Sequence, residues 1–200
     1  MPTTKEGLIP RIVLTGGPGG GKTTTLNYLR ENYPSLYIEP EAATIVLQSG
    51  FPVPNEERPW TYEWQLAFQE AVRGVQLGLD DLADFEASRV GAEAIIQDRS
   101  HVDAAVYYKN IKAYERHAKT KLIRQLGRAS IVFFLPTFAG TPNFDPRANP
   151  HRFEEQQTMI ELSNNLEEIW KAHPRLYKIE ASTVENRALI IGGVIEALIH

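Results

Sequence analysis

The chain has 200 residues, of which 42% are hydrophobic and 23% charged, and its formal net charge is -4. These values predict a single globular domain over residues 1–200 and argue against a second full domain, while the acidic balance argues against broad nucleic-acid binding. The lack of cysteine excludes disulfides, thiolate catalysis and cysteine-ligated zinc. The sequence lacks an apolar signal core and any apolar stretch long enough to span a bilayer, so we expect a cytoplasmic protein without a transmembrane segment.

A glycine-rich loop follows the first predicted strand, residues 9–15. Residues 16–23 read GGPGGGKT and fit G-x-x-x-x-G-K-[ST], the loop that holds nucleoside triphosphates. The segment after it forms a predicted helix, so several N–H groups and the positive end of a helix dipole meet one anion. We expect Lys22 to reach the β- and γ-phosphates and Thr23 to hold Mg²⁺. The expected nucleotide-binding residues are Gly16, Gly17, Gly19, Gly20, Gly21, Lys22, Thr23 and Thr24.

Four more short apolar runs are predicted strands, at residues 36–39, 94–98, 130–136 and 176–180. The long separations between them leave room for crossover helices. This pattern predicts an α/β fold, with a five-stranded parallel sheet covered by helices on both faces. Ligands then gather beyond the carboxyl ends of the strands. The C-terminal run ALIIGGVIEALI predicts a buried helix.

Two acidic residues follow the second strand, where YIEPEAAT places Glu39 and Glu41 on either side of a proline. One interpretation is structural, because acids in the first turn of a helix interact well with its dipole. The other is functional: beyond a strand that neighbours the phosphate loop, a carboxylate can accept a proton from a substrate hydroxyl. We favour Glu41 for that role because it lies closer to the expected helix start.

The third strand ends in QDRSHVD, where an apolar run stops at Asp98. A carboxylate at this place suits Mg²⁺ coordination opposite the phosphate loop. Arg99 beside it has the forked geometry to clamp a phosphoryl group or a substrate carboxylate. The competing interpretation is a helix cap by Ser100 next to a surface pair of Asp98 and Arg99.

Two weaker clusters allow a functional and a structural interpretation each. Aromatic residues lie close together in the segment FPVPNEERPWTYEWQLAFQEAV and could wall a pocket for a flat ring or belong to the core. Basic residues at helical spacing predict one stripe, which could meet a phosphorylated ligand, an acidic lipid surface or a protein partner, or be a solvated helix face. The aromatic cluster comprises Phe51, Trp60, Tyr62, Trp64 and Phe68, and the basic stripe comprises Lys109, Lys112, Arg116 and Lys119.

Together, the segments GGPGGGKTT, IEPEAA, QDRSHVDAAVY and DPRANPHRFEE resemble the NadR/TRP-translocation-defect-type AAA domain, a branch of P-loop proteins akin to nucleoside and nucleotide kinases. The resemblance spans nearly the whole chain. It implies a five-stranded parallel sheet, binding of Mg-ATP or Mg-GTP, and in some members phosphorylation of a nucleoside-like substrate such as nicotinamide riboside. It also implies a lid after the fourth strand, residues 137–152, with Arg152 and secondly Arg147 closing on the transferred phosphoryl group. Alternatively, these arginines are solvated beside acidic residues.

The leading hypothesis is a Mg²⁺-dependent P-loop phosphotransferase that acts on a small, hydroxyl-bearing, nucleoside-like metabolite. The expected catalytic residues are Lys22, Glu41, Asp98, Arg99, Arg147 and Arg152, with Thr23 and Asp98 on the metal side. The rival is a regulatory NTPase, in which nucleotide orders a loop for a protein or lipid partner. The sequence lacks the guanine-reading pattern N-K-x-D, which favours ATP over GTP. The acceptor and the oligomeric state stay open.

Overall fold

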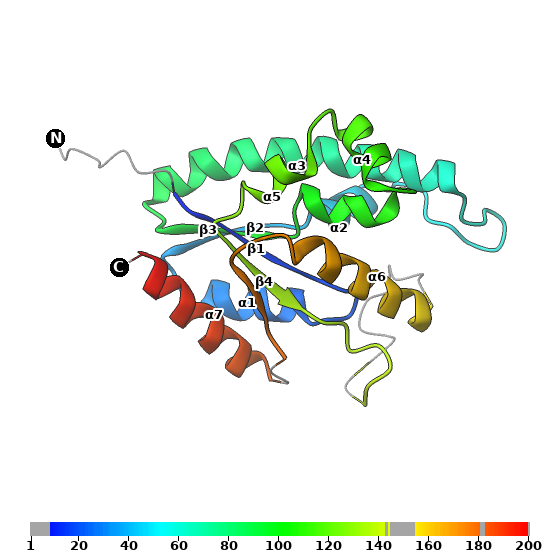
Figure 1. Ribbon diagram of the computed structural model, residues 1–200. Helices are drawn as coiled ribbons and strands as arrows, with labels where there is room; N and C mark the ends of the chain where they lie inside the picture. The colour runs from blue at the N-terminus through cyan, green and yellow to red at the C-terminus, as the bar shows by residue number, and fades with distance from the viewer. Residues whose placement is uncertain (1–8, 143, 145–154, 181–182, 200) are drawn as a thin grey trace.

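The computed structural model describes residues 9–142, 144, 155–180 and 183–199. Five parallel strands form one sheet in the order β2-β3-β1-β4-β5 (Figure 1). The strands are β1 (Arg11–Gly16), β2 (Leu36–Glu39), β3 (Ala94–Asp98), β4 (Ile131–Leu135) and β5 (Leu176–Lys178). The predicted five-stranded parallel sheet is confirmed, and each predicted strand boundary lies within two residues of the observed one.

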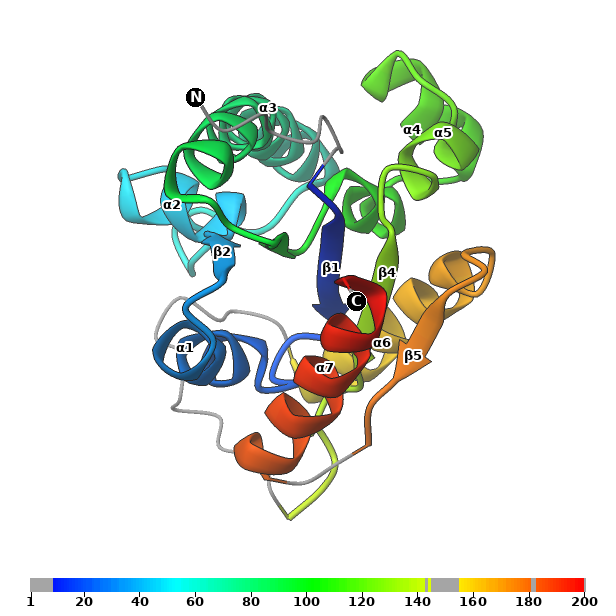
Figure 2. The same cartoon turned by 90° about the vertical axis from the view of Figure 1, so that its left-hand side faces the viewer.

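Helices cover both faces of the sheet, as predicted. α1 and α7 lie against one face, while the long helix α3 lies across the other (Figures 1 and 2). The helices are α1 (Lys22–Asn32), α2 (Ala42–Gln48), α3 (Tyr62–Val90), the 3₁₀ helix η1 (His101–Tyr107), α4 (Ile111–Ala118), α5 (Leu122–Leu126), α6 (Gln156–Trp170) and α7 (Val184–Ile199). In the described part of the chain, we find no helix with the length and apolar character needed to cross a bilayer.

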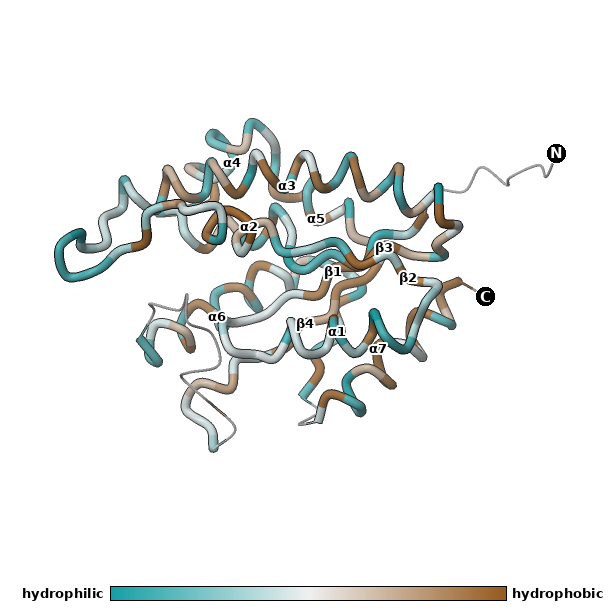
Figure 3. Tube along the Cα trace, turned by 180° about the vertical axis from the view of Figure 1, so that it is seen from behind, coloured by the Kyte–Doolittle hydropathy of each residue, from teal (hydrophilic) through white to brown (hydrophobic). Residues whose placement is uncertain are grey.

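Alternation along β1 explains why the sheet carries a core on each face. Ile12 and Leu14 pack toward α1 and α7, whereas Val13 packs with Val132 of β4 and Trp170 of α6 on the opposite face. Successive side chains of a strand point to opposite faces, so a strand that is covered on both sides is apolar throughout. The middle of β1 and the whole of β4 are accordingly hydrophobic (Figure 3).

The C-terminal helix α7 differs from the prediction of a fully buried helix. Ile191 and Ile195 are 1% and 2% exposed and face the core, but Leu189 and Ile190 are 64% and 45% exposed. A helix that lies on one side of a sheet buries one stripe of its surface. The apolar run therefore predicts the helix correctly but not the exposure of its outer face.

The strand order corrects one expectation about the site. We expected the second strand to neighbour the phosphate loop, but β3 lies between β1 and β2. Asp98 at the end of β3 stands in register with Leu14 of β1, whereas Glu39 of β2 is in register only with Gln97 of β3. The end of β3 is thus the immediate neighbour of the loop that follows β1.

Candidate functional site

The loop between β1 and α1 needs glycine at its two ends. Gly16 has a φ of 138°, and a Cβ atom there would lie 1.9 Å from the carbonyl oxygen of Leu135. Gly21, the residue before α1, has a φ of 78°. Residues other than glycine rarely adopt these φ angles, and at Gly16 there is no space for a side chain. The backbone of the loop therefore lies close to β4, and the first turn of α1 faces the space in front of the loop.

Lys22 opens α1 and is only 7% exposed. Its Nζ donates hydrogen bonds to the carbonyl oxygens of Gly16 at 3.1 Å and Gly17 at 2.9 Å, across the loop. Burial, followed by the charge of Arg99, lowers the pKa of Lys22 to about 8. Among the described residues, the ammonium group donates to two neutral carbonyl oxygens, so an anion in front of the loop would be a stronger partner.

Asp98 lies at the end of β3 and is 6% exposed. Its Oδ1 atom is buried and accepts no hydrogen bond within the described ranges of the chain. Burial, and then the nearby Glu41 carboxylate, raise the pKa of Asp98 to about 7. A buried acceptor without a donor is unusual and suits a hydrated Mg²⁺ ion, which is built from oxygen ligands and donates through its waters. Thr23, the other expected metal residue, is exposed at the start of α1.

Arg99 and Glu41 form an ion pair although 58 residues separate them in sequence. Nε of Arg99 donates to Oε1 of Glu41 at 2.6 Å, and Nη1 donates to the carbonyl oxygen of Gly16 at 3.2 Å. Burial alone would raise the pKa of Glu41, but the charges of Arg99 and Lys22 together lower it. Glu41 is therefore ionised at neutral pH, at the N-terminal end of α2.

The competing interpretation of the QDRS segment is partly right. Ser100 does cap η1, because its side chain accepts a hydrogen bond from the backbone N–H of Val102 at 3.2 Å. The expected surface pair of Asp98 and Arg99 is wrong, since the side chain of Asp98 is buried and Arg99 pairs with Glu41. Arg99 also has a φ of 69°, a left-handed conformation that is uncommon for a residue with a Cβ atom.

Asp103 is a buried site residue that our sequence reasoning missed. It accepts hydrogen bonds from Oγ1 of Thr15 at 2.8 Å and from Nε1 of Trp170 at 2.7 Å. Its Oδ2 also lies 3.7 Å from Nη1 of Arg99. The i, i+4 spacing of Arg99 and Asp103 was the only local signal, and its meaning depends on Thr15 and Trp170 from distant segments.

Arg187 of α7 is a second missed residue. It is 4% exposed, and its Nη1 donates to the carbonyl oxygen of Gly20 at 3.4 Å. Its guanidinium carbon lies 4.7 Å from the ring centre of Phe138, which follows β4. An arginine in a C-terminal amphipathic helix carries no local sign of such a contact, so only the packing of α7 beside the loop brings it there.

One cavity of about 840 Å³ connects these groups. Its walls include the phosphate loop from Pro18 to Thr24, Glu41 and Arg99, together with one face of α3. The two missed residues Asp103 and Arg187 also line it, whereas Asp98 lies outside the lining. The loop, the ion pair and a stretch of α3 therefore share a single space that is large enough for more than one small ligand.

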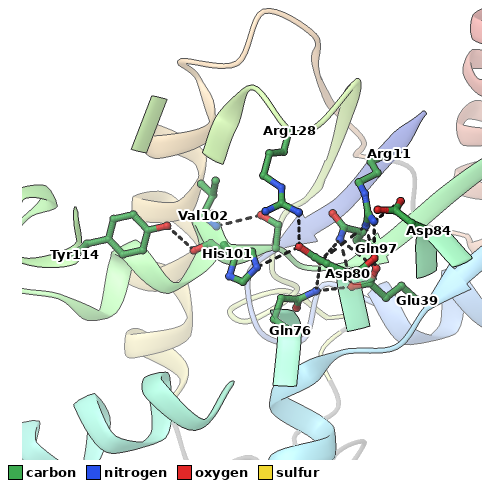
Figure 4. Close-up of polar contacts among 11 residues, drawn as sticks. Arg11, Glu39, Gln76, Asp80, Asp84, Gln97, His101, Val102, Tyr114 and Arg128 are labelled. Carbon is green, nitrogen blue, oxygen red and sulfur yellow. Dashed lines mark hydrogen bonds and ion pairs between the residues drawn. The ribbon is translucent and has the colours of Figure 1, made fainter. Parts of the chain in front are cut away.

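Glu39, the alternative acid after β2, belongs to a different cluster. It is 1% exposed and lies among Arg11 of β1, Gln97 of β3 and the α3 residues Gln76 and Asp80 (Figure 4). Nη1 of Arg11 lies 3.3 Å from Oε2 of Glu39, and Nε2 of Gln97 donates to the same oxygen at 3.1 Å. Burial, followed by the charge of Asp80, raises the pKa of Glu39 to about 7. Glu39 does not line the cavity.

The raised pKa of Glu39 predicts a pH dependence of stability. An acid whose pKa rises from 4.5 to about 7 on folding binds more protons in the folded state, so the free energy of unfolding falls as pH increases between these values. The Glu39→Gln variant should lose this contribution, on the order of 3 kcal/mol. Urea unfolding of both proteins from pH 4.5 to 7, with exposed Glu57→Gln as control, measures the difference. Parallel stability curves for wild type and Glu39→Gln would contradict the prediction.

The structure brings part of the aromatic cluster together but does not form the predicted basic stripe. Phe51, Trp64 and Phe68 contact one another, but Phe68 alone of the five expected aromatic residues lines the cavity, and Trp60 is 52% exposed. The prediction of a single helical basic stripe is wrong, because α4 begins at Ile111, after Lys109, and ends before Lys119, which adopts a φ of 53°.

The expected lid, residues 137–152, lies largely outside the described residues, and Arg147 and Arg152 lie wholly outside them.

A family model described as an AAA domain matches residues 11–187 of this chain. The chain belongs to this family. The match begins at the first residue of β1 and ends at Arg187, so the phosphate loop and the whole cavity lining identified above belong to the AAA domain. The predicted resemblance to a P-loop AAA domain is confirmed.

The AAA domain also shares the fold of a solved nucleotide kinase. The structure of thymidylate kinase from Candida albicans matches it with a TM-score of 0.61 over 94% of this chain and 91% of that chain. Sequence identity is 16%, so the likeness shows the fold alone. A comparison with curated proteins gives no match. The chain is therefore a P-loop AAA domain that resembles a nucleotide kinase in architecture.

Proposed function

We propose that this AAA domain is a Mg²⁺-dependent phosphotransferase that moves a phosphoryl group from ATP to a hydroxyl group of a small, nucleoside-like acceptor. One observation carries the proposal: the phosphate loop and the ionised Glu41 face the same cavity. A regulatory switch needs the loop but has no need for a carboxylate in the same cavity. A phosphotransferase needs both, because donor and acceptor must meet without bulk water.

On the donor side, the loop and the first turn of α1 line the cavity from Pro18 to Thr24, and backbone N–H groups of this segment would bind phosphate oxygens, while Lys22 supplies a buried positive charge. Thr23 and Asp98 would hold Mg²⁺ with its waters, a role that fits the unpartnered Oδ1 atom of Asp98. The ion would neutralise charge on the phosphate oxygens. Arg187 from α7 lies beside Gly20 and would border the nucleotide.

On the acceptor side, Glu41 would orient the hydroxyl group and accept its proton. The acceptor oxygen bonds to the γ-phosphorus while the bond from that phosphorus to the β,γ-bridging oxygen breaks, and ADP leaves with the electron pair. Arg99 lies between Glu41 and the carbonyl of Gly16, where its fixed charge would stabilise the phosphoryl oxygens. We also assign Arg147 and Arg152 to this stabilisation, from the segment beyond the described residues.

The direct test is an acceptor screen. ATP and Mg²⁺ are incubated with the protein and with nucleosides, nucleotides or phosphorylated metabolites in turn, and ADP release is measured with the phosphorylated product. We expect at least one nucleoside-like compound to stimulate ADP release with equal product formation. Nucleotide binding without transfer to any acceptor would instead favour the regulatory NTPase.

The Asp98→Asn variant tests the metal assignment. It keeps the shape of the side chain but loses the charge that would hold the hydrated ion, so we expect the Mg²⁺ concentration for half-maximal ATP stabilisation to rise about 10- to 100-fold. A Mg²⁺ titration followed by thermal unfolding measures this, with exposed Asp81→Asn as control. An unchanged Mg²⁺ response in folded Asp98→Asn would move the metal role to another carboxylate.

A further inference from the structure

Asp80 is a buried carboxylate that the phosphoryl transfer proposed above does not use. It lies within α3, is 3% exposed and does not line the cavity. Burial alone would raise the pKa of Asp80, but the hydrogen bond and the charge of His101, followed by the charge of Arg128, lower it. Asp80 is therefore ionised at neutral pH. A buried charge is costly unless donors surround it, so its hydrogen-bond partners indicate which segments it holds.

Both oxygens of Asp80 contact side chains from other elements (Figure 4). Oδ1 accepts a hydrogen bond at 2.8 Å from Nε2 of Gln97, the last residue but one of β3. Oδ2 accepts from Nη2 of Arg128 at 2.6 Å and lies 3.3 Å from Nε2 of His101, the first residue of η1. Because an ionised carboxylate can only accept, this ring nitrogen of His101 carries the proton. Asp80 thus binds β3 and η1 at once.

These two bonds enclose the segment that carries two of the candidate catalytic residues. Gln97 and His101 stand on either side of residues 98–100, and both side chains bond to the same carboxylate. The hydroxyl group of Tyr114 also donates to the carbonyl oxygen of His101 at 2.9 Å, so His101 is held through its ring and its backbone (Figure 4). The enclosed residues cannot move relative to α3 without stretching a bond to Asp80.

Arg99 is the enclosed residue that needs such support. Its φ of 69° is left-handed, and a residue with a Cβ atom keeps this conformation only where the surrounding contacts impose it. The direction of its side chain depends on that backbone conformation. In this direction, Nε donates to Glu41 at 2.6 Å and Nη1 donates to the carbonyl oxygen of Gly16 at 3.2 Å. A relaxed backbone at Arg99 would turn the guanidinium group away from both partners.

We propose that Asp80 is a positioning residue for Arg99. From α3, it fixes Gln97 and His101. It thereby keeps Arg99 in the left-handed conformation in which the guanidinium group bonds to Glu41. The catalytic benefit rests on the proposed function, in which Arg99 stabilises the transferred phosphoryl group. The geometry of Arg99 does not depend on any reaction, so it can be measured separately.

The test follows the Nε–Hε signal of Arg99 in ¹H–¹⁵N NMR spectra, assigned by its loss in Arg99→Lys. A hydrogen bond to a carboxylate protects this proton from exchange with water. In Asp80→Asn, an N–H₂ group replaces one acceptor oxygen, so we expect Hε of Arg99 to exchange about 10- to 100-fold faster. Asp84→Asn is the matched control, because Asp84 lies one turn along α3 and pairs with Arg11 at 2.6 Å, but its side chain is 64% exposed. It should keep the exchange rate of wild type.

Two further sites separate positioning from a general loss of stability. Ile195→Ala, in the core between the sheet and α7, should lower Tm by creating a cavity but leave the Arg99 signal unchanged. His101→Gln keeps an N–H donor for Asp80 and should retain slow exchange, whereas His101→Leu should exchange as fast as Asp80→Asn. If Asp80→Asn fails to fold, the two His101 variants take its place. Equally fast exchange in Ile195→Ala, or in both His101 variants, would contradict the proposal.

Failure of this inference differs from failure of the proposed function. Slow exchange at Arg99 in folded Asp80→Asn overturns the positioning role and leaves phosphotransfer intact. Fast exchange in Asp80→Asn, together with a wild type that phosphorylates no acceptor, keeps the positioning role and overturns the phosphotransferase. With an active wild type, Asp80→Asn should lower kcat by about 10-fold or more and change the KM for ATP by only a few-fold. An unchanged kcat would overturn the positioning role.

Discussion

The Lys22→Ala variant is expected to lose the thermal stabilisation that ATP and Mg²⁺ give to the wild type. At a ligand concentration about 100 times Kd, wild type should gain about 2.7 kcal/mol, which corresponds to a rise in Tm of about 5–10 °C for a domain of this size. The Nζ atom of Lys22 spans the loop between two carbonyl oxygens and is its buried point charge. Without it, the β- and γ-phosphates lose their closest cation, and the rise in Tm should be less than about 1 °C.

Thermal unfolding with and without ATP measures this effect. Lys112→Ala is the matched control, because Lys112 is exposed on α4 and does not line the cavity. It should gain as much Tm as wild type. A Lys22→Ala protein that is folded and still gains the full Tm shift would mean that ATP binds elsewhere or is held by backbone N–H groups alone.

The Glu41→Gln variant should separate phosphate transfer from nucleotide binding. The change keeps the shape of the side chain but removes its charge and its basicity. Glu41 faces the cavity from the start of α2, and its hydrogen-bonded link to the phosphate loop runs through Arg99, which contacts the carbonyl oxygen of Gly16. We therefore expect ATP affinity to stay within a few-fold of wild type, while acceptor phosphorylation falls by about 100-fold or more, the usual scale for a general base.

The measurement pairs calorimetry of ATP binding with a product assay, and exposed Glu31→Gln on α1 serves as control. A regulatory switch would give a different result. Glu41 would then matter only as a partner of Arg99, and Glu41→Gln would change stability or ATP affinity without a separate effect on transfer. Full acceptor phosphorylation by Glu41→Gln would overturn the catalytic role that we propose for Glu41.

The sequence by itself determined the features that depend on neighbouring residues. The glycines and Lys22 of the phosphate loop are close together in the chain. At Gly16, the positive φ and the lack of space for a Cβ atom leave glycine as the residue that fits. The strands were predictable because parallel strands covered on both faces are continuous apolar runs. Asp98 and Arg99 could be chosen as candidates because they directly follow such a run.

The tertiary structure alone decided which of these groups meet. The strand order places β3 beside β1, so Asp98 lies near the loop while Glu39 lies among Arg11 and Gln97 under α3. The local sequence distinguishes Glu39 from Glu41 only by their distance from the expected helix start, since both are carboxylates two residues apart. Their pKa values move in opposite directions because one meets Asp80 in a buried cluster and the other meets Arg99.

The residues of the cavity wall could not be predicted from the sequence for the same reason. Gln65 and Gln76 are similar residues on one helix, and only packing determines that one meets Trp60 and the other Asp80. Arg187 reaches the phosphate loop across 167 residues of sequence. Local sequence determines which backbone conformations and which faces are favourable, whereas contacts between distant segments depend on the order in which the strands pair and on the helices that this order brings together.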